Sequence, residues 1–148
     1  MALTCPNEGS QLQPGEDHHV KYERCPACNG GWFDMDEFEQ LEASVGKGNA
    51  LAGTIEYAER ATALHCPSCG KPMVAFDYRG ENLTLDACND EHGFWLDGGA
   101  SDRVRALMRE RIQGLQRAAK AEGQWNAERE RGFKPTLVER LRQLLTGK

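Results

Sequence analysis

The chain has 148 residues, 39% of them hydrophobic, with six cysteines and a formal net charge of −5. This length fits one ordinary domain or two small ones, and no apolar run approaches the roughly 18 residues that a membrane-spanning helix needs. The first residues, MALTCPNEG, lack the basic flank and apolar stretch of a signal peptide. We therefore expect a cytoplasmic protein without a membrane span, whose cysteines bind metal instead of forming disulfides.

Charge is distributed unevenly along the chain. Residues 1–50 carry a net charge of −6 and residues 51–100 carry −5, whereas residues 101–148 carry +6. Only the C-terminal part is therefore expected to attract a polyanion.

An internal repeat organises the first 100 residues. Trp32 and Trp95 are 63 residues apart, as are Cys25 and Cys88. A spacing shared by different residue types indicates two copies of one unit. The matching segments are CPNEG (5–9) with CPSCG (66–70), and CPACNGGWFD (25–34) with CNDEHGFWLD (88–97).

Local signals in each copy predict a knuckle, a β-hairpin, a second knuckle and a short helix. PGED at 14–17 and Gly80 are typical of hairpin turns. Asp34 and Glu37 fit a helix capping box, and Asp97 is expected to open the matching helix of the second copy. The predicted fold class is small α+β: two tandem zinc ribbons followed by a C-terminal helical arm.

The chain is thereby divided into four segments, with helix interruptions expected at Gly123 and Gly132. TIEYAERATAL (54–64), which overlaps the segment between the two units, is a candidate helix packed between them. The segments are a first ribbon with a short helix (1–46), the linker (47–63), a second ribbon (64–100) and a basic helical arm ending in an amphipathic helix (101–148).

Cysteine spacing indicates two zinc sites. Zn²⁺ takes four donors in a tetrahedron, and two residues between cysteines let one tight turn aim both sulfurs at the ion. Each copy supplies three cysteines, so each site needs one more donor. The candidate cysteine ligands are Cys5, Cys25 and Cys28 in the first site, and Cys66, Cys69 and Cys88 in the second.

The fourth donors are not cysteines. Glu8 stands in the first site where Cys69 stands in the second. In the second site, repeat spacing favours Glu91, because Glu91 precedes Trp95 by four residues just as Cys28 precedes Trp32. Ligand chemistry favours His92, because imidazole is the better partner for three thiolates. We favour His92, with Glu91 as the alternative.

Three other interpretations stay open. The cysteines could be small buried apolar residues, the first site could be empty, or it could hold an open, catalytic zinc with Glu8 or water in the fourth position. The paired knuckles in a duplicated frame favour structural zinc, since units of about 45 residues bury too little surface to fold unaided.

The motifs resemble the bacterial zinc-finger family named after the zinc ribbon of transcription factor IIB. CPACNGGWFDMDEF and CNDEHGFWLDGGAS are similar to the second half of its unit, and CPNEG and CPSCG to the first. The resemblance covers residues 3–45 and 64–108 and departs from the family pattern at Glu8 and at Glu91/His92. Its name implies transcription, but a shared ribbon does not convey that function.

The sequence favours a non-catalytic zinc adaptor whose arm recruits a protein partner. Trp32 and Trp95 are expected to be core residues, with an exposed platform for stacking bases as the alternative. A nucleic-acid-binding or transcription-linked protein using the basic arm is the second interpretation, and self-association is a further option. The apolar face expected to meet the partner consists of Leu137, Val138, Leu141, Leu144 and Leu145.

Overall fold

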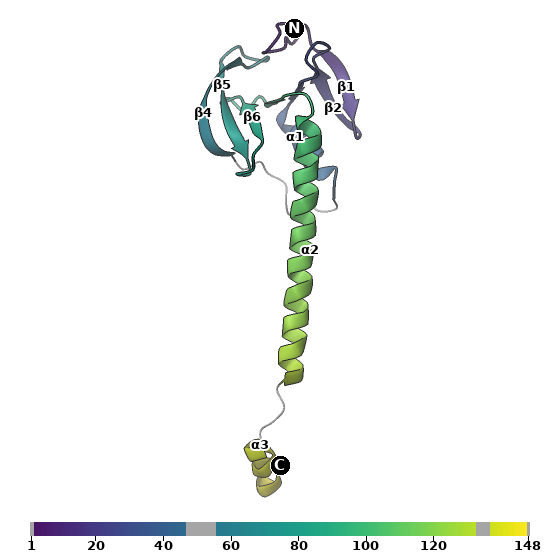
Figure 1. Ribbon diagram of the computed structural model, residues 1–148, viewed down its shortest axis with the longest axis vertical. Helices are drawn as coiled ribbons and strands as arrows, with labels where there is room; N and C mark the ends of the chain where they lie inside the picture. The colour runs from purple at the N-terminus through teal and green to yellow at the C-terminus, as the bar shows by residue number, and fades with distance from the viewer. Residues whose placement is uncertain (1, 47–55, 133–136, 148) are drawn as a thin grey trace. The chain divides into compact units, whose positions relative to one another are not determined.

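A computed structural model describes residues 2–46, 56–132 and 137–147. These residues form an antiparallel sheet, two shorter helices and one long helix (Figure 1). The strands are β1 (Gln13–Asp17), β2 (Val20–Arg24), β3 (Gly31–Phe33), β4 (Glu56–His65), β5 (Pro72–Tyr78), β6 (Thr84–Ala87) and β7 (Phe94–Leu96). The helices are α1 (Met35–Ala43), α2 (Ala100–Gly132) and α3 (Leu137–Thr146).

Residues 1–112 form one compact unit and residues 113–148 form another, with α2 beginning in the first and ending in the second. Within the first unit, hairpin β1–β2 and strands β4–β6 lie on opposite sides of the start of α2 (Figure 1). No helix in the described part of the chain is both long enough and apolar enough to cross a membrane.

One sheet joins the two sequence repeats. Its strand order is β1-β2-β3-β7-β6-β5-β4, so the repeats meet where β3 pairs antiparallel with β7. Trp32 pairs with Trp95, its own counterpart in the other repeat, and Phe33 pairs with Phe94. Equivalent residues that face each other in antiparallel strands place an approximate two-fold axis at the tryptophan pair, as in an isologous dimer interface.

The tryptophans are core residues, because Trp32 is only 3% exposed and Trp95 is fully buried. This burial is inconsistent with the alternative of an exposed stacking platform. Two glycines at equivalent repeat positions allow the close packing. A Cβ on Gly30 would lie 2.3 Å from the Trp95 ring, and one on Gly93 would lie 2.2 Å from the carbonyl oxygen of Phe33.

Helix α1 of the first repeat packs on strands of the second. It begins as predicted with a capping box, in which Asp34 accepts from the Glu37 N–H and the Glu37 carboxylate accepts from the Asp34 N–H. Phe38 then packs against Phe94 and edge-on against Tyr78, at centroid distances of 4.5 and 6.0 Å. The repeats are therefore joined through helix packing as well as through the sheet.

A buried polar cluster adds to this joint. The Tyr78 hydroxyl donates to the carboxylate of Glu42 on α1, and Arg79 approaches the same carboxylate at 3.5 Å. Burial, followed by the neighbouring Glu42, raises the pKa of Tyr78. Because both side chains are buried and mutually satisfied, they specify how α1 sits on the second repeat.

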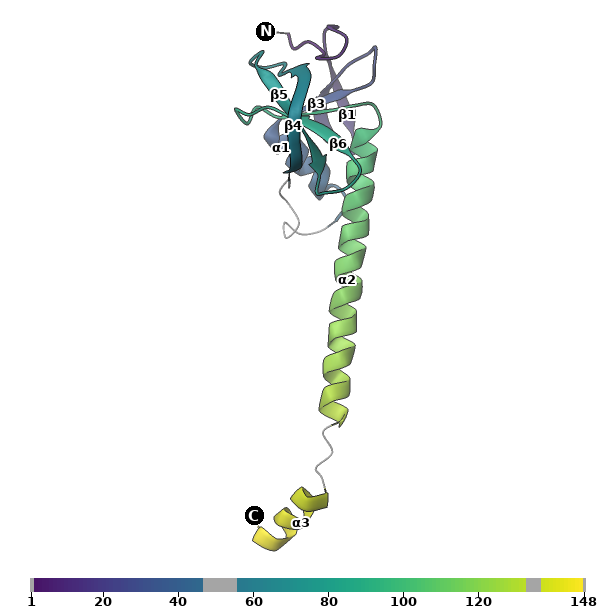
Figure 2. The same ribbon diagram turned by 60° about the vertical axis from the view of Figure 1, so that its left-hand side comes forward.

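The helix predicted over 54–64 is wrong, since Glu56–His65 is strand β4. Alanine, glutamate, arginine and leucine in this segment favour helix by local propensity, but pairing with β5 overrides it. Arg60 fixes the strand by donating to Asp77 and Thr84. Figure 2 shows β4, β5 and β6 side by side.

Two expectations for the long helix also need correction. Helix α2 runs through Gly123 without a break and ends at Gly132, because one glycine costs only about 1 kcal/mol within a run of good helix formers. Asp97 does not open the helix, which begins at Ala100. Its carboxylate instead accepts from the Trp95 indole N–H and from Asn7, each at 3.1 Å.

Candidate metal centres

Four short loops of similar backbone carry the candidate ligands. In each loop the N–H of a cysteine donates to the carbonyl oxygen of the residue five positions later. Such a tight loop lets the cysteine sulfur and a following side chain face one point. The bonded pairs are Cys5–Ser10, Cys25–Gly30, Cys66–Lys71 and Cys88–Gly93.

Three loops place a left-handed residue four positions after the cysteine. These residues are Gly9, Asn29 and Gly70, with φ of 70°, 60° and 72°, and each N–H donates back to the cysteine carbonyl. Glycine and asparagine adopt this conformation at low cost. The residue just before the left-handed position is where a second ligand is expected, and it is Glu8, Cys28 or Cys69.

The fourth loop turns one residue earlier, which bears on the choice between Glu91 and His92. Here Glu91 itself is left-handed, with φ of 57°, and its N–H donates to the carbonyl of Cys88. His92 follows the left-handed residue, and its Nδ1 lies 3.4 Å from the Cys88 sulfur and 4.0 Å from that of Cys66. The repeat spacing assigns the position of Cys28 to Glu91 only if the loops after Cys25 and Cys88 turn at the same position. They do not, because the left-handed residue is Asn29 in the first and Glu91 in the second.

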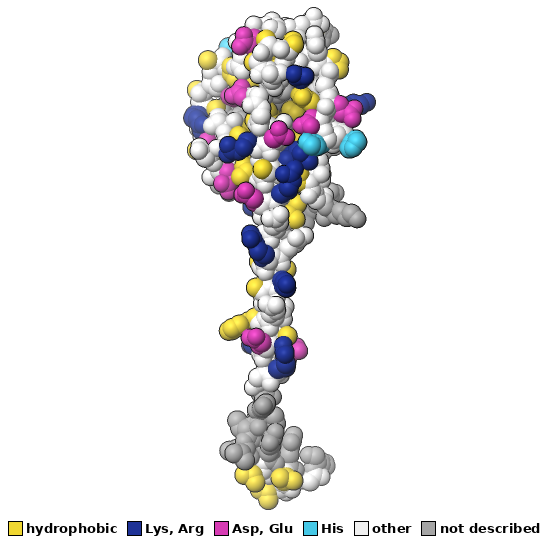
Figure 3. Space-filling model, turned by 45° about the vertical axis from the view of Figure 1, so that its right-hand side comes forward, with side chains coloured by type: hydrophobic (Ala, Val, Ile, Leu, Met, Phe, Trp, Pro, Cys, Tyr) yellow, Lys and Arg dark blue, Asp and Glu magenta, His cyan; other side chains and the backbone are white. Residues whose placement is uncertain are grey.

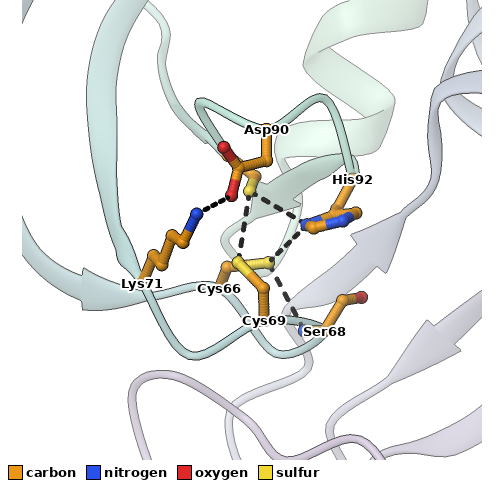
Figure 4. A network of polar contacts seen from close by, with 7 residues as sticks. Cys66, Ser68, Cys69, Lys71, Asp90 and His92 are labelled. Carbon is orange, nitrogen blue, oxygen red and sulfur yellow. Dashed lines mark hydrogen bonds and ion pairs between the residues drawn. The ribbon is translucent and has the colours of Figure 1, made fainter.

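The second centre consists of Cys66, Cys69, Cys88 and His92, whose donor atoms all lie within 4.8 Å of one another. The Cys88 sulfur is 3.7 Å from that of Cys69 and 3.4 Å from His92 Nδ1. A tetrahedron with Zn–S bonds of about 2.3 Å has sulfur–sulfur edges of about 3.8 Å. The donor set and its spacing therefore fit Zn²⁺, and Figure 4 shows the side chains converging.

Burial raises the pKa values of these thiols, whereas hydrogen bonds from backbone N–H groups lower them. Burial raises the pKa of Cys66 to about 12, although the Ser68 N–H lies 3.4 Å from its sulfur. The backbone N–H of Lys71 lowers the pKa of Cys69 to about 7. Cys69 is thus partly thiolate at neutral pH, whereas a buried thiol such as Cys66 ionises when metal replaces its proton.

The first centre contains Cys5, Cys25 and Cys28. The Cys5 and Cys28 sulfurs are 3.7 Å apart, again the edge of a zinc tetrahedron, and the Cys28 N–H lies 3.5 Å from the Cys25 sulfur. Burial raises the pKa of Cys5 to about 11. Burial also raises the pKa of Cys25, but the backbone N–H groups of Cys28 and Ala27 lower it, and the pKa is lowered overall.

Glu8 is not brought together with these cysteines. Its backbone occupies the ligand position of the first loop, next to Gly9. Its N–H lowers the pKa of the Cys5 thiol, against the larger effect of burial. Its side chain, however, is exposed and lies outside the cysteine group. The described chain thus gathers three donors at the first centre and four at the second.

Both centres border the tryptophan joint. Cys5, Cys25, Cys66 and Cys88 belong to one buried cluster, which also contains Trp32 and Trp95. The metal centres and the contact between repeats are therefore parts of one core, which the sequence repeat alone does not predict.

A further group of candidate donors was missed by sequence reasoning. His18 Nε2 lies 3.2 Å from an oxygen of Asp17 and 4.0 Å from one of Asp102. His18 and Asp102 are exposed, and the contact links the β1–β2 turn to the first turn of α2. No spacing signal reveals this pair, because its members belong to different repeats.

Comparison with known families supports the metal-binding interpretation of the first repeat. Residues 4–44 match the family model described as transcription factor zinc-finger. The predicted zinc ribbon of transcription-factor-IIB type is thereby confirmed for this part of the chain, while the match does not extend to the second repeat. No curated protein and no solved structure matches the chain.

Proposed function

We propose that this chain is a non-catalytic, cytoplasmic zinc-binding adaptor, in which two zinc ribbons form one head and the helical arm recruits a protein partner. The proposal is carried by the contrast between the two ends of the molecule. Sulfur donors at zinc spacing are embedded in the core of residues 1–112, whereas α3 exposes large leucines. A buried metal that shares the core with the main joint fits a structural role.

The ligand set of the second centre is proposed as Cys66, Cys69, Cys88 and His92. His92→Ala should lose one of two bound zinc ions, or lower the affinity for that ion more than about 100-fold. Removing a ligand should cost more than removing a residue that only hydrogen-bonds to a ligand, which lowers metal affinity about 10–100-fold. Glu91→Asn is the matched control, since asparagine tolerates the left-handed backbone. Zinc content after competition with a chelator measures both, and the reverse order would assign the ligand to Glu91.

The arm is proposed to dock through α3. Leu141, Leu144 and Leu145 are 54%, 80% and 84% exposed, while the side chains of Leu137 and Val138 lie outside the described part of the structure. An isolated ten-residue helix is marginal in water. An amphipathic helix of this kind commonly gains stability by laying its apolar face in a groove of another protein.

Replacing Leu141, Leu144 and Leu145 by alanine should abolish recruitment. Three leucines that become buried on docking would contribute several kcal/mol, so we expect at least about a 100-fold loss of affinity. Arg142→Ala, on the same helix, is the matched control and should bind normally. Capture from native-host extract by full-length chains, followed by titration of the captured protein, measures the effect; unchanged binding of the triple variant would contradict the proposal.

Exposed cations on α2 support a second candidate function, nucleic-acid binding. Arg109, Arg111, Arg117 and Lys120 are exposed, and Figure 3 shows Lys and Arg side chains scattered along α2. Arg105 is not available, because it is buried and donates to the Ser44 hydroxyl. Acidic residues 1–100 oppose phosphate binding, so a salt-sensitive mobility shift with RNA or DNA would be needed to favour this candidate.

A further inference from the structure

The two centres differ at one corner of the tetrahedron. In the second centre the chain supplies three sulfurs and one imidazole nitrogen. In the first, the described residues supply three sulfurs, and the loop position that holds Cys69 in the second repeat holds Glu8. The candidates for a fourth donor at the first centre are the Glu8 carboxylate and a group from outside the chain, water included.

This corner is on the exposed side of the first centre. Cys5 and Cys25 are 2% and 0% exposed, whereas Cys28 is half-buried and Glu8 is exposed. Cys5 and Cys25 belong to the tryptophan cluster and Cys28 packs against it, whereas Glu8 is exposed to solvent. The loop position that holds Glu8 is therefore the part of this centre that is open to solvent.

Charge makes Glu8 a weak occupant. Three thiolates with one Zn²⁺ already carry about −1, and a carboxylate would bring the centre to about −2. The first loop also lies against another acid, because Asn7 donates to the carboxylate of Asp97 at 3.1 Å. A neutral nitrogen donor leaves the centre at about −1, the value reached at the second centre with His92.

We propose that the first centre has an exchangeable fourth position that accepts a neutral imidazole nitrogen from outside the chain. The inference rests on the zinc-binding part of the proposed function and adds a ligand-binding role to one of its two centres. The second centre is closed by His92 and does not exchange. The ligand is either free imidazole or a histidine side chain on another polypeptide, since both present the same donor atom.

Cobalt-substituted full-length protein tests this inference, because tetrahedral Co²⁺ absorbs visibly and reports its ligands. Imidazole should change the spectrum of one of two bound cobalt ions and saturate at one imidazole per chain. Glu8→Cys places a fourth sulfur at the loop position held by Cys28 and Cys69 in the other loops. It should lower the affinity for imidazole, read from the cobalt spectrum, at least tenfold. Glu91→Asn, an exposed acid beside the second centre, should leave it unchanged. A parallel titration with a histidine-containing peptide distinguishes the two sources, and a response to either supports the proposal.

Three results would overturn it. The first is no spectral change in the wild-type chain. The second is a change that persists undiminished in Glu8→Cys, which would place the exchange at the second centre. The third is a response confined to Glu8→Ala, which would make the carboxylate a firm ligand. Cobalt content is measured first: fewer than two ions per chain counts against the proposed zinc function, whereas two ions without a response counts against this inference alone.

Discussion

Removal of zinc at neutral pH should unfold residues 1–112. Structural zinc sites have apparent binding free energies of about 10–16 kcal/mol, whereas a whole domain is stable by only about 5–15 kcal/mol. The thiols border Trp32 and Trp95, so stripping the metal also leaves buried groups without their charge partner. Chelation should therefore collapse the β signal in circular dichroism and shift tryptophan emission toward that of exposed indole.

The same sample supplies controls. Returning Zn²⁺ should restore the spectra, whereas Mg²⁺ should not, because thiolate and imidazole donors select zinc over hard cations. Trp125 is 64% exposed before chelation, so the emission shift should come from the two buried tryptophans. Native protein with well under one zinc per chain, or chelated protein with an unchanged melting curve, would refute the structural role of the metal.

Features set by neighbours in sequence were predictable. Asp34 and Glu37 form the capping box that their spacing indicates. The turn around Gly80 joins β5 to β6, and a small α+β fold with an antiparallel sheet and a long C-terminal helix is confirmed. The turn predicted at PGED (14–17) is wrong, because these residues belong to strand β1 and the turn lies at His18 and His19. The cysteines that spacing assigns to each centre also lie together in the structure, in two groups. The capping box, the Gly80 turn and the individual cysteine loops depend on local backbone geometry, which a sequence pattern records directly.

Features set by contacts between the repeats were not predictable. Nothing in a three-residue strand such as β3 states that its partner is β7. The segment Glu56–His65 reads as helix until β5 is present to pair with it. Burial of Glu42 against Tyr78 and the contact of His18 with Asp102 depend on the same arrangement. Once β3 and β7 pair about their tryptophans, the contacts of Glu42 and His18 follow, whereas β4 depends on its pairing with β5.

The second-centre ligand shows how a backbone detail limits sequence reasoning. Glu91 and His92 are adjacent, and only the position of the left-handed residue distinguishes the side chains directed at the cysteines. In the other loops glycine or asparagine indicates a left-handed residue, whereas a glutamate, here at φ of 57°, gives no such indication in the sequence. The repeat spacing favours Glu91, whereas donor chemistry favours His92, and it is the His92 nitrogen that lies within 4.8 Å of the three sulfurs. The ligand itself stays a prediction.

Trp95→Ala should have the largest effect of any single substitution outside the cysteines. The ring is fully buried, its indole N–H donates to Asp97, and a side chain on Gly30 would collide with it. Truncation of a buried tryptophan costs about 3–5 kcal/mol, and here the cavity opens at the joint between the repeats and beside both metal centres. We expect a loss of this size in urea unfolding, together with weaker zinc retention at both centres.

Trp125→Ala is the matched control, because it removes the same side chain from an exposed position on α2. Its effect should stay within about 0.5 kcal/mol. Equal effects of the two substitutions would mean that the tryptophan pair does not hold the repeats together. If Trp95→Ala weakened zinc retention at one centre only, the two centres would fold independently. A joint shared by both repeats should instead weaken zinc retention at both centres.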